Sequence, residues 1–486
     1  MKITLIRYHD LDNTSTRLAK SLNDRQGVLP PLGLAYIASS LEGAGHEVDL
    51  IDAIALCLSK EEVSLRIKEF DPELVGITAM TPTFHGALEA ARIAKEHDKK
   101  TLIGGVHMSI YPKETLSYDE IDFGIVGEGE ESIIEFCSAL EEGQDYESIE
   151  GLCYKLDDGT IKVGQPRIVK DITKLPMPSY HLLPMEKYSS IIGMKPVSTM
   201  MGSRGCPYQC GFCYKTPSDK KYRTRSAENI VDEIEFLIEN YKIKEVMFYD
   251  DIMPQAYARD LSNEIIQRKV KINWQSPQRV NLVNPELLRL MAKSGCHILR
   301  FGVEQGDEDM MRLVEKRITA DQVRASFRDA NAAGIKTFAY FIIGYTGETE
   351  RTMQATIDLA KELNPTYVMF TKAVPLPRTP LMTDSVSEGL VDPDYWQKYT
   401  LGVKQPQMPN LVENADKWVA KAYRSFYLRP SVIFNRLLSI RTFHDVKRHV
   451  DAFIGIVGFK MNDNALSIQK QNDTLLSSEI TLTTIK

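Results

Sequence analysis

Three cysteines within eight residues are the clearest candidates for chemistry in this chain. Cys206, Cys210 and Cys213 lie in the stretch GSRGCPYQCGFC, with the spacing C-x3-C-x2-C. Thiolates bind soft metals, and a structural zinc site usually takes four ligands in two pairs. Here no fourth cysteine follows nearby, and no histidine lies between residues 190 and 296. A [4Fe-4S] cluster fits better, because three cysteines ligate three irons and leave the fourth iron open for a small molecule.

The segments around these cysteines alternate between strand and helix patterns. Helical patterns such as 226–241 and 352–364 separate the strands, and Ser226 or Asn229 is the expected N-cap of the first. Six candidate strands cover 197–203, 245–251, 272–276, 297–303, 336–344 and 367–372. Six β/α units make most of a TIM barrel, whose chemistry lies at the carboxyl ends of the strands. We therefore predict a partial (β/α)6 barrel over residues 197–380, with the cysteines at its active end.

A separate alternating series precedes the barrel. Its candidate strands cover 2–6, 47–52, 73–78, 100–105 and 122–130, with helical patterns between them. This pattern predicts a doubly wound, Rossmann-like parallel sheet over residues 1–143. Glycine-rich turns follow two neighbouring strands, at the edge where open parallel sheets bind ligands. The alternative is that these glycines only form tight turns.

The remaining segments connect or extend these two units. Residues 144–196 read as a linker that contains a β-hairpin, and residues 381–460 as a helical C-terminal extension. Residues 461–486 are rich in polar residues and are predicted to be a flexible tail. The predicted fold class is therefore α/β: an N-terminal doubly wound parallel sheet, a partial TIM barrel and a helical C-terminal extension.

Composition excludes several function classes. The 486 residues carry 59 Lys and Arg against 66 Asp and Glu, a net charge of −7, so nucleic acid is not an expected partner. We find no signal peptide and no apolar run long enough to span a bilayer. The seven cysteines form no disulfide framework, which indicates a reducing cytoplasm. Four of them show no cluster spacing, so we expect a single cluster and a buried, inert Cys296.

The cysteine motif resembles that of the radical SAM superfamily. CPYQCGFC matches closely, including the aromatic Phe212 before the last cysteine. The resemblance implies that the open iron binds S-adenosylmethionine (SAM), and that one electron from the cluster cleaves SAM to a 5′-deoxyadenosyl radical. It also implies a reductant such as flavodoxin or ferredoxin. The protein then supplies orientation and exclusion of water.

Other residues lie where that superfamily places its SAM contacts. Asp250 and Asp251 end the second barrel strand and resemble the carboxylates that take the SAM ammonium; a solvated turn is the alternative. Glu304 resembles a ribose contact, and Arg300 is either a contact of the SAM carboxylate or an outward salt-bridge residue. Gly344 lies in a signature at the fifth strand, where it lets the backbone approach the adenine. Related enzymes often have glycine in the place of Arg378.

The N-terminal series resembles the cobalamin-binding domain that one class of radical SAM enzymes carries. The stretches PPLGLAYIASSLEGAGHEVDLIDA, PELVGITAMTP, GGVH and GIVGEGE bear the resemblance. The D-x-H-x-x-G motif that places a histidine under cobalt is absent, so any cobalamin is expected without that ligand. The candidate contacts are Met80, Thr81, Pro82, Thr83, Gly104, Gly105, His107, Gly127, Glu128 and Gly129. The alternatives are a sheet that has lost the cofactor and, for His107 alone, a surface histidine.

The two domains together resemble the methyltransferase, hopanoid-modifying and anaerobic cyclase members of this class. The resemblance implies methyl transfer from methylcobalamin to an unactivated carbon, with a small molecule, lipid or peptide as substrate. The alternatives are radical cyclisation or rearrangement of a hydrophobic or lipid substrate, and a cobalamin-free radical SAM enzyme with a relic sheet. Residues 424–448 mix basic and apolar side chains, which predicts either peripheral membrane contact or a helix packed on the barrel. A cobalamin-responsive binding protein is disfavoured because a binder needs no cluster.

Overall fold

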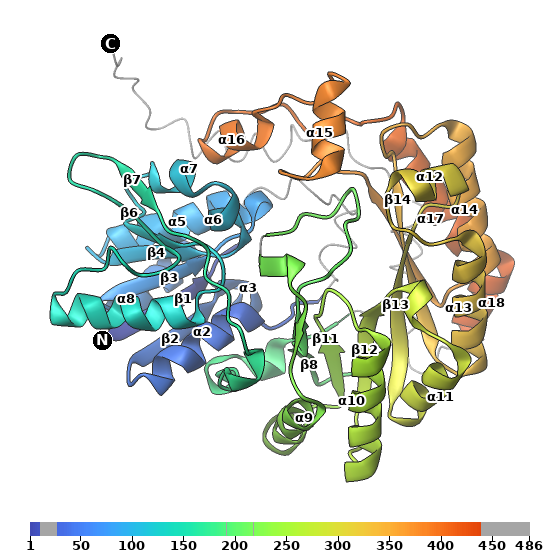
Figure 1. Ribbon diagram of the computed structural model, residues 1–486, viewed down its shortest axis with the longest axis horizontal. Coiled ribbons are helices and arrows are strands. Elements are labelled where there is room, and N and C mark those ends of the chain that lie inside the picture. Colours follow the sequence, from blue (N-terminus) through green and yellow to red (C-terminus); the bar gives the residue numbers. More distant parts are fainter. Residues whose placement is uncertain (10–26, 191, 217, 439–486) are drawn as a thin grey trace.

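The chain folds into two α/β units that lie side by side. The computed structural model describes residues 1–9, 27–190, 192–216 and 218–438. The blue and cyan unit of Figure 1 is the N-terminal sheet, and the green and yellow unit is the barrel. The α/β class, with a parallel sheet, a partial barrel and C-terminal helices, is confirmed.

The N-terminal unit contains a seven-stranded sheet in the order β2-β1-β3-β4-β5-β6-β7. Its five parallel strands are β1 (Lys2–Arg7), β2 (Glu47–Asp52), β3 (Leu74–Thr78), β4 (Lys100–Gly104) and β5 (Phe123–Ile125). These strands are short apolar runs because helices cover both faces of the sheet. The strand order reverses between β1 and β3, and such a switch point is where open α/β sheets bind ligands.

Helices pack on both faces of this sheet. Helices α2 (Leu32–Gly43) and α8 (Glu130–Glu142) pack on one face, whereas α4 (Lys60–Phe70) and α5 (Phe84–Lys95) pack on the other. Helix α4 begins at a capping box, in which Ser59 and Glu62 bond each other's backbone amides. The doubly wound prediction is thereby confirmed.

The predicted hairpin between the two units extends the sheet. Strands β6 (Leu152–Lys155) and β7 (Ile161–Val163) pair antiparallel with each other, and β6 pairs antiparallel with β5. We predicted these residues as part of a linker. The structure instead adds them to the first unit, because β6 completes the edge of β5 and its residues Leu152, Cys153 and Tyr154 are buried.

The second unit is a barrel sheet of six parallel strands in the order β15-β14-β13-β12-β11-β8. The strands are β8 (Val197–Met200), β11 (Glu245–Phe248), β12 (Asn273–Gln278), β13 (Cys296–Glu304), β14 (Lys336–Ile343) and β15 (Tyr367–Lys372). The helices on its outer side include α9 (Ala227–Tyr241), α10 (Gln255–Arg268), α11 (Pro285–Lys293), α13 (Ala320–Ala332) and α14 (Glu350–Leu363). Ser226, one of the two predicted caps, accepts from the backbone amide of Asn229.

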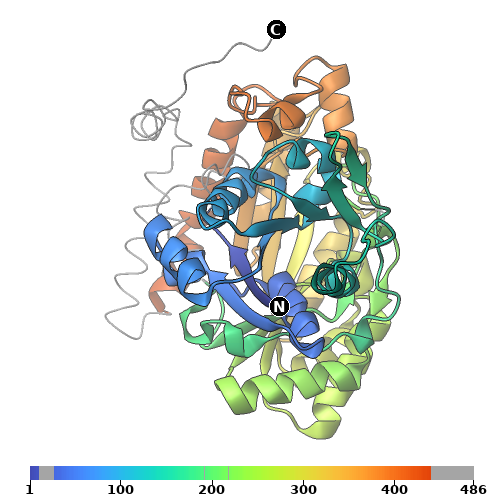
Figure 2. The same cartoon turned by 90° about the vertical axis from the view of Figure 1, so that its left-hand side faces the viewer.

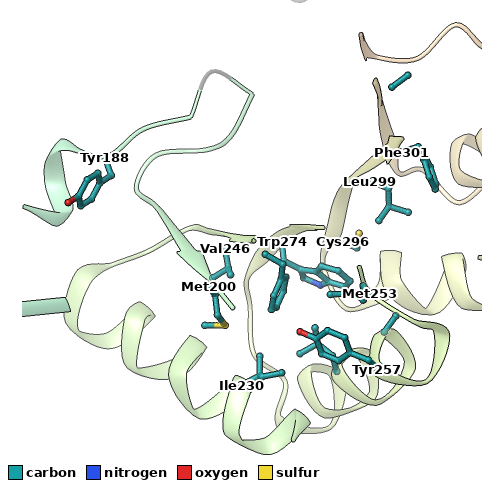
Figure 3. Close-up of a cluster of buried hydrophobic side chains, with 14 of the residues drawn as sticks. Tyr188, Met200, Ile230, Val246, Met253, Tyr257, Trp274, Cys296, Leu299 and Phe301 are labelled. Carbon is teal, nitrogen blue, oxygen red and sulfur yellow. The ribbon is translucent and has the colours of Figure 1, made fainter. Parts of the chain in front are cut away.

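The core between these strands and helices is aromatic and aliphatic. Figure 3 shows Trp274 of β12 beside Val246, with Tyr257 of α10 and the predicted buried Cys296 nearby. The Trp274 ring meets the ring of Phe248 edge to face, with centroids 5.8 Å apart, and its Nε1 donates to the carbonyl of Ser294 over 3.2 Å. A filled core at this level holds the strand ends, and therefore the site residues beyond them, in fixed positions.

The C-terminal extension closes the open edge of the barrel. It contains α15 (Pro380–Ser387), α16 (Tyr395–Thr400), α17 (Ala415–Tyr427) and α18 (Pro430–Leu438). The hydroxyls of Tyr427 and Tyr423 accept from the backbone amides of Val368 and Phe370 in the edge strand β15, over 3.1 and 3.2 Å. An edge strand without partners would expose these amides. Helix α17 therefore packs on the barrel, as one of our two interpretations predicted.

Two predicted features lie wholly or partly outside the described residues: the end of the basic and apolar segment, and the tail 461–486. Within the described ranges, no helix is long and apolar enough to cross a membrane.

Helix α16 returns from the barrel to the first unit (Figures 1 and 2). The hydroxyl of Tyr399 donates to the carbonyl of Pro82 over 3.2 Å, and the hydroxyl of Tyr118 donates to the carbonyl of Thr400 over 2.7 Å. Arg378 donates to the carbonyl of Ile110 over 2.6 Å. The loops at the carboxyl ends of β3 and β4 thus contact segments that follow β15, the last barrel strand.

Candidate active site

The loop that carries the cysteines leaves the first barrel strand and returns through a short antiparallel pair. Strands β9 (Ser203–Arg204) and β10 (Arg223–Thr224) form this pair. Gly205 follows β9 with φ +85°, and a Cβ there would lie 2.6 Å from the carbonyl oxygen of Lys221. Only glycine fits so close an approach in the left-handed region. Cys206 follows this turn, and its amide donates to the carbonyl of Asp219 over 2.8 Å, which joins the two ends of the loop.

Backbone contacts shape the rest of the cysteine loop. The Cys213 amide donates to the Cys210 carbonyl over 3.0 Å, and Lys215 Nζ donates to the Cys206 carbonyl over 2.6 Å. Cys206 and Cys210 are half-buried residues and Cys213 is an exposed residue. In the described ranges no three His, Cys, Asp or Glu side chains are close enough to hold one metal ion. A [4Fe-4S] cluster has a different requirement, since each cysteine binds its own iron.

Phe212 packs at the mouth of the barrel. It contacts a group of buried apolar side chains that includes Tyr345 and Val314. The amide of the neighbouring Gly211 donates to the carbonyl of Val314 over 3.0 Å. These contacts anchor the loop between its second and third cysteines.

The two carboxylates after β11 differ in environment. Asp250 is buried, and its Oδ1 accepts from the backbone amides of Gly202 and Ser203 over 2.8 and 2.9 Å. Burial raises the pKa of Asp250 to about 7. Asp251 is an exposed residue, but partial burial of its carboxyl and the nearby Asp219 raise its pKa. Asp250 therefore holds the chain that enters the cysteine loop, while Asp251 has the exposure that a contact of SAM requires; both assignments to SAM remain predictions.

The residues predicted for the ribose and carboxylate of SAM lie on β13. Glu304 is buried with φ +70° and pairs with Lys316, whose Nζ lies 2.5 Å from Glu304 Oε1. Arg300 donates through Nη2 to the carbonyl of Phe248 over 2.5 Å. Its Nε is buried without a hydrogen-bond partner among the described residues, and its assignment to the SAM carboxylate remains a prediction.

Gly344 follows β14 at the same edge of the barrel, with φ +84°. Its amide and that of Tyr345 donate to Glu348 Oε2 over 2.5 and 2.9 Å. Burial raises the pKa of Glu348 to about 7. The structure brings Phe212, Gly344 and the β11 and β13 carboxylates to the barrel end that holds the cysteines.

The candidate cobalamin residues lie at the carboxyl ends of β3, β4 and β5. Met80 and Val106 are large apolar side chains with 59% and 42% of their surface exposed. Gly104 is the last residue of β4, and a Cβ there would meet no atom within 4 Å. Exposed apolar side chains above an open strand end suit a large flat cofactor, so the residues present fit cobalamin. Gly105 turns the chain away with φ +96°, and a Cβ there would lie 2.6 Å from the carbonyl oxygen of Ala79.

The loop after β3 is the short helix η1 (Thr81–Thr83). Thr83 Oγ1 accepts from the Met80 amide over 3.2 Å, and Thr81 is buried. His107 is also buried, which corrects the surface alternative: its ring stacks on Phe84 with centroids 4.1 Å apart, and Nδ1 lies 3.2 Å from Thr81 Oγ1. Burial lowers the pKa of His107 to about 3, so the imidazole is neutral. Its Nε2 has no hydrogen-bond partner within the described residues.

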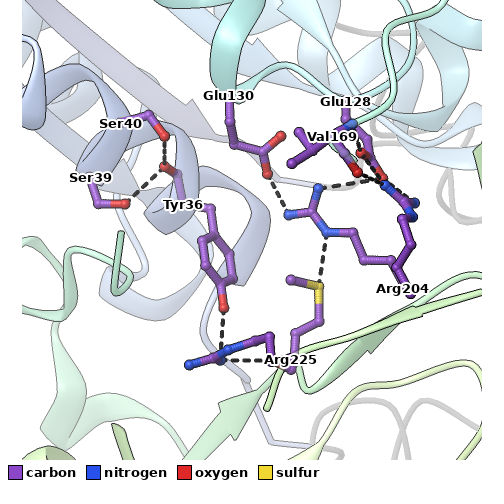
Figure 4. A network of polar contacts seen from close by, with 10 residues as sticks. Tyr36, Ser39, Ser40, Glu128, Glu130, Val169, Arg204 and Arg225 are labelled. Atoms are coloured by element: carbon purple, nitrogen blue, oxygen red, sulfur yellow. Dashed lines mark hydrogen bonds and ion pairs between the residues drawn. The ribbon is translucent and has the colours of Figure 1, made fainter. Parts of the chain in front are cut away.

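The turn after β5 contacts the barrel (Figure 4). Gly127 and Gly129 flank Glu128, whose carboxylate accepts from Arg223 over 2.7 and 2.8 Å. Arg204 pairs with Glu128 over 3.5 Å and with Glu130 in a shorter contact. Burial would raise the pKa of Glu128, but Arg223 and Arg204 hold it below its ordinary value. The side chain of Glu128 is therefore engaged with the strand pair that carries the cysteine loop.

Sequence reasoning missed Arg204, Arg223, Arg279 and Lys316. Arg279 directly follows β12 and Arg204 directly precedes Gly205. For Arg279 the available signal was a cationic residue directly after a barrel strand, because the carboxyl ends of these strands carry the chemistry.

Two known domain families match the chain where the two units lie. The B12 binding domain family matches residues 21–136 and the Radical SAM superfamily matches residues 200–360. An uncharacterized methyltransferase of Pyrococcus horikoshii is 36% identical over 412 residues, which are 83% of this chain and 89% of that protein. This chain belongs to the B12-binding radical SAM family. Both domains that the motifs predicted in this radical SAM enzyme are thus confirmed.

Other similarities cover most of this radical SAM enzyme. The anaerobic magnesium-protoporphyrin IX monomethyl ester cyclase of Rubrivivax gelatinosus is 29% identical, over 84% of this chain and 75% of that protein. The structure of OxsB, a cobalamin-dependent SAM radical enzyme with aqua-cobalamin and SAM bound, superposes with a TM-score of 0.72 at 15% identity, covering 98% of this chain and 75% of that chain. The structure of TsrM, a radical SAM methyltransferase from Kitasatospora setae with cobalamin and a [4Fe-4S] cluster, superposes with a TM-score of 0.64 at 20% identity, covering 80% and 75%. At these identities the two structures establish the shared fold.

Proposed function

We propose that this radical SAM enzyme transfers a methyl group to an unactivated carbon, using a [4Fe-4S] cluster, SAM and cobalamin. When bound, these groups supply the one-electron cleavage of SAM and the methyl group. One observation carries the proposal: the carboxyl ends of the two parallel sheets contact each other, through Glu128 with Arg204 and through Ile110 with Arg378. One substrate at this interface can therefore reach both cofactor sites.

The chain's own residues have three tasks in this proposal. Cys206, Cys210 and Cys213 hold the cluster, and Asp250 fixes the backbone that leads into their loop. The apolar side chains of Met80 and Val106, together with the open space above Gly104, form the contact surface for cobalamin. The buried network between the sheet and the barrel excludes water from the interface, as radical chemistry requires.

The similarity to a cyclase favours a second candidate function. Because the Rubrivivax gelatinosus relative is a cyclase, radical cyclisation or rearrangement of a hydrophobic substrate is the alternative to methyl transfer. The two candidates share the cluster and differ in the fate of SAM. Methyl transfer consumes one SAM as methyl donor and a second as radical source, whereas cyclisation needs only the second.

The substrate is a small molecule, lipid or peptide that enters between the two units, and a flavodoxin- or ferredoxin-like protein is the proposed electron donor. We also propose a reducing, cytoplasmic setting, since an open iron is sensitive to oxygen. Peripheral membrane contact remains a prediction for residues 424–448. Within the described residues, the apolar face of α17 packs on the barrel through the buried Tyr423 and Phe426.

The decisive experiment is metal stoichiometry followed by product analysis. The protein is purified without oxygen, reconstituted with iron and sulfide, loaded with hydroxocobalamin and desalted. We expect about four irons and about one cobalt per chain. Candidate substrates should then yield S-adenosylhomocysteine together with 5′-deoxyadenosine. Iron without cobalt would exclude methyl transfer through cobalamin, and 5′-deoxyadenosine alone would favour cyclisation.

A further inference from the structure

Arg279 reaches from the end of β12 to the cysteine loop. Only 7% of its surface is exposed, and Nη1 lies 3.8 Å from Cys210 Sγ, within hydrogen-bond range of a sulfur acceptor. Its guanidinium carbon lies 3.7 Å from the centre of the Tyr208 ring, which is itself inside the motif. Cation–π contact and the N–H···S bond therefore fix the same short segment from one side.

The opposite side of the guanidinium is held by the fold. Nη2 donates to the carbonyl of Lys316, and Nε donates to Asn281 Oδ1 over 3.2 Å. These neutral acceptors orient the group without neutralising it. In the described part of the chain Arg279 forms no ion pair with a carboxylate, whereas the nearby Lys316 is paired with Glu304.

A buried cation without an anionic partner is costly. The group within reach of Arg279 that becomes anionic is the Cys210 thiol, once it binds iron as a thiolate. We propose that Arg279 is a positioning residue of the cluster: it holds Cys210 in place and raises the reduction potential of the cluster. This inference rests on the proposed function, because it requires that the cluster is bound.

The physical reason is charge. The relevant step adds one electron from an external donor, [4Fe-4S]2+ + e− → [4Fe-4S]1+, and makes the cluster more negative. Hydrogen bonds to ligand sulfurs and positive charge nearby stabilise the reduced form more than the oxidised form. Burial of Arg279 strengthens this effect, because little water screens the interaction.

The test is a redox titration of the reconstituted protein without SAM, followed by the EPR signal of the reduced cluster. Iron per chain is measured first in the wild type and in the variants Arg279→Gln, Arg279→Lys and Arg259→Gln. Arg259→Gln is the control, because Arg259 forms an ion pair with Glu286 on the surface. We expect a more negative midpoint potential in Arg279→Gln and a smaller shift in the same direction in Arg279→Lys, which keeps the charge but loses the planar fork. Arg259→Gln should match the wild type.

The other possible results of this experiment also support or overturn the role proposed for Arg279. Unchanged potentials in loaded Arg279 variants would overturn the proposal. If SAM is then added and these variants bind it more weakly than the wild type does, Arg279 would be assigned to SAM instead. Variants that have a native circular dichroism spectrum but bind no iron would support the positioning role. Variants that do not fold would overturn it, because they would show that Arg279 stabilises the protein without any role at the cluster. A wild type that takes up no cluster would refute the proposed function itself.

Discussion

At the scale of single residues, similar side chains in one motif have different environments. Asp250 and Asp251 are neighbours, yet one accepts two backbone hydrogen bonds inside the protein and the other is exposed. The three motif cysteines are half-buried or exposed residues, while Cys296 is buried at the start of β13. Function at this scale depends on exposure as well as on residue type.

Replacing any one of Cys206, Cys210 or Cys213 with alanine should remove the cluster and SAM cleavage. Each thiolate holds a different iron, so two ligands are too few for a stable cluster. Iron should fall from about four per chain to a small fraction, and 5′-deoxyadenosine should fall below detection. Cys57→Ser is the matched control because Cys57 is exposed and far from the motif in sequence. Retained cleavage in one of the three alanine variants contradicts the assignment.

Asp250 should make the folded protein less stable as pH rises. Its folded pKa, about 7, exceeds the ordinary value of 3.8, so the folded state binds the proton more tightly than the unfolded state does. Its contribution to stability is complete below pH 3.8 and is lost as pH rises to about 7. Asp250→Asn keeps an acceptor for the Gly202 and Ser203 amides and removes the ionisation. The gain in thermal midpoint over wild type should be larger at pH 7.5 than at pH 5. At the higher pH the corresponding gain in the free energy of unfolding should be on the order of a few kcal/mol.

The control is Asp119→Asn, whose side chain is fully exposed. It should change the midpoint little at either pH. An equal effect of Asp250→Asn at both pH values would show that the carboxyl does not titrate in this window.

At the scale of elements, strand ends decide where ligands bind. Strands β1 and β3 flank the reversal of strand order, and β4 ends on Gly104 with open space above it. The helices α2, α5 and α8 are used for packing, so the ligand-facing groups come from the loops.

Gly104→Val should weaken cobalamin binding without disturbing the fold. The added side chain enters open space in the free protein, and valine suits a strand end. We expect hydroxocobalamin affinity to fall at least tenfold (about 1.4 kcal/mol), measured by absorbance titration, with an unchanged thermal midpoint of the cobalamin-free protein. Gly43→Ala, which also enters open space at the end of α2, should bind normally. If Gly104→Val binds cobalamin as tightly as the wild type does, cobalamin does not bind at the end of β4.

At the scale of the whole molecule, two cofactor domains are useful only if they are held face to face. The network of Glu128, Glu130, Arg204 and Arg223 connects the turn after β5 to the cysteine loop. Helix α16 makes a second connection over the loop after β3. The relative position of the two sites is thus maintained by buried charge pairs on one side and by hydroxyl contacts on the other.

Arg223→Met should destabilise the domain interface. The side chains of Arg223 and Glu128 are 5% and 13% exposed, and removing one member of a buried pair costs about 3–5 kcal/mol when the other charge is left alone. Because Arg204 still lies 3.5 Å from Glu128, we expect a loss at or below the lower end of this range. The thermal midpoint should fall by several degrees, and protease should cut more readily between the domains. The double variant Arg223→Met with Glu128→Leu should recover most of the loss. Arg324→Met, which breaks an exposed pair with Glu362, should have almost no effect.

The sequence by itself determined the motif cysteines, the class of both domains and most strands. These features are local: cysteine spacing, apolar runs and strand–helix alternation are properties of short segments. The hairpin β6–β7 was recognised, but its membership of the sheet was not, because pairing with β5 is a non-local contact.

Only the tertiary structure decided which partner each polar side chain has. Arg279 and Cys210 are 69 residues apart, and Glu128 and Arg223 are 95 apart. His107 lies in a short glycine-rich stretch that is typical of a surface turn, yet the packing of α5 buries it against Phe84. Such contacts depend on the curvature of the barrel and on how the two domains dock, and no local sequence pattern records either.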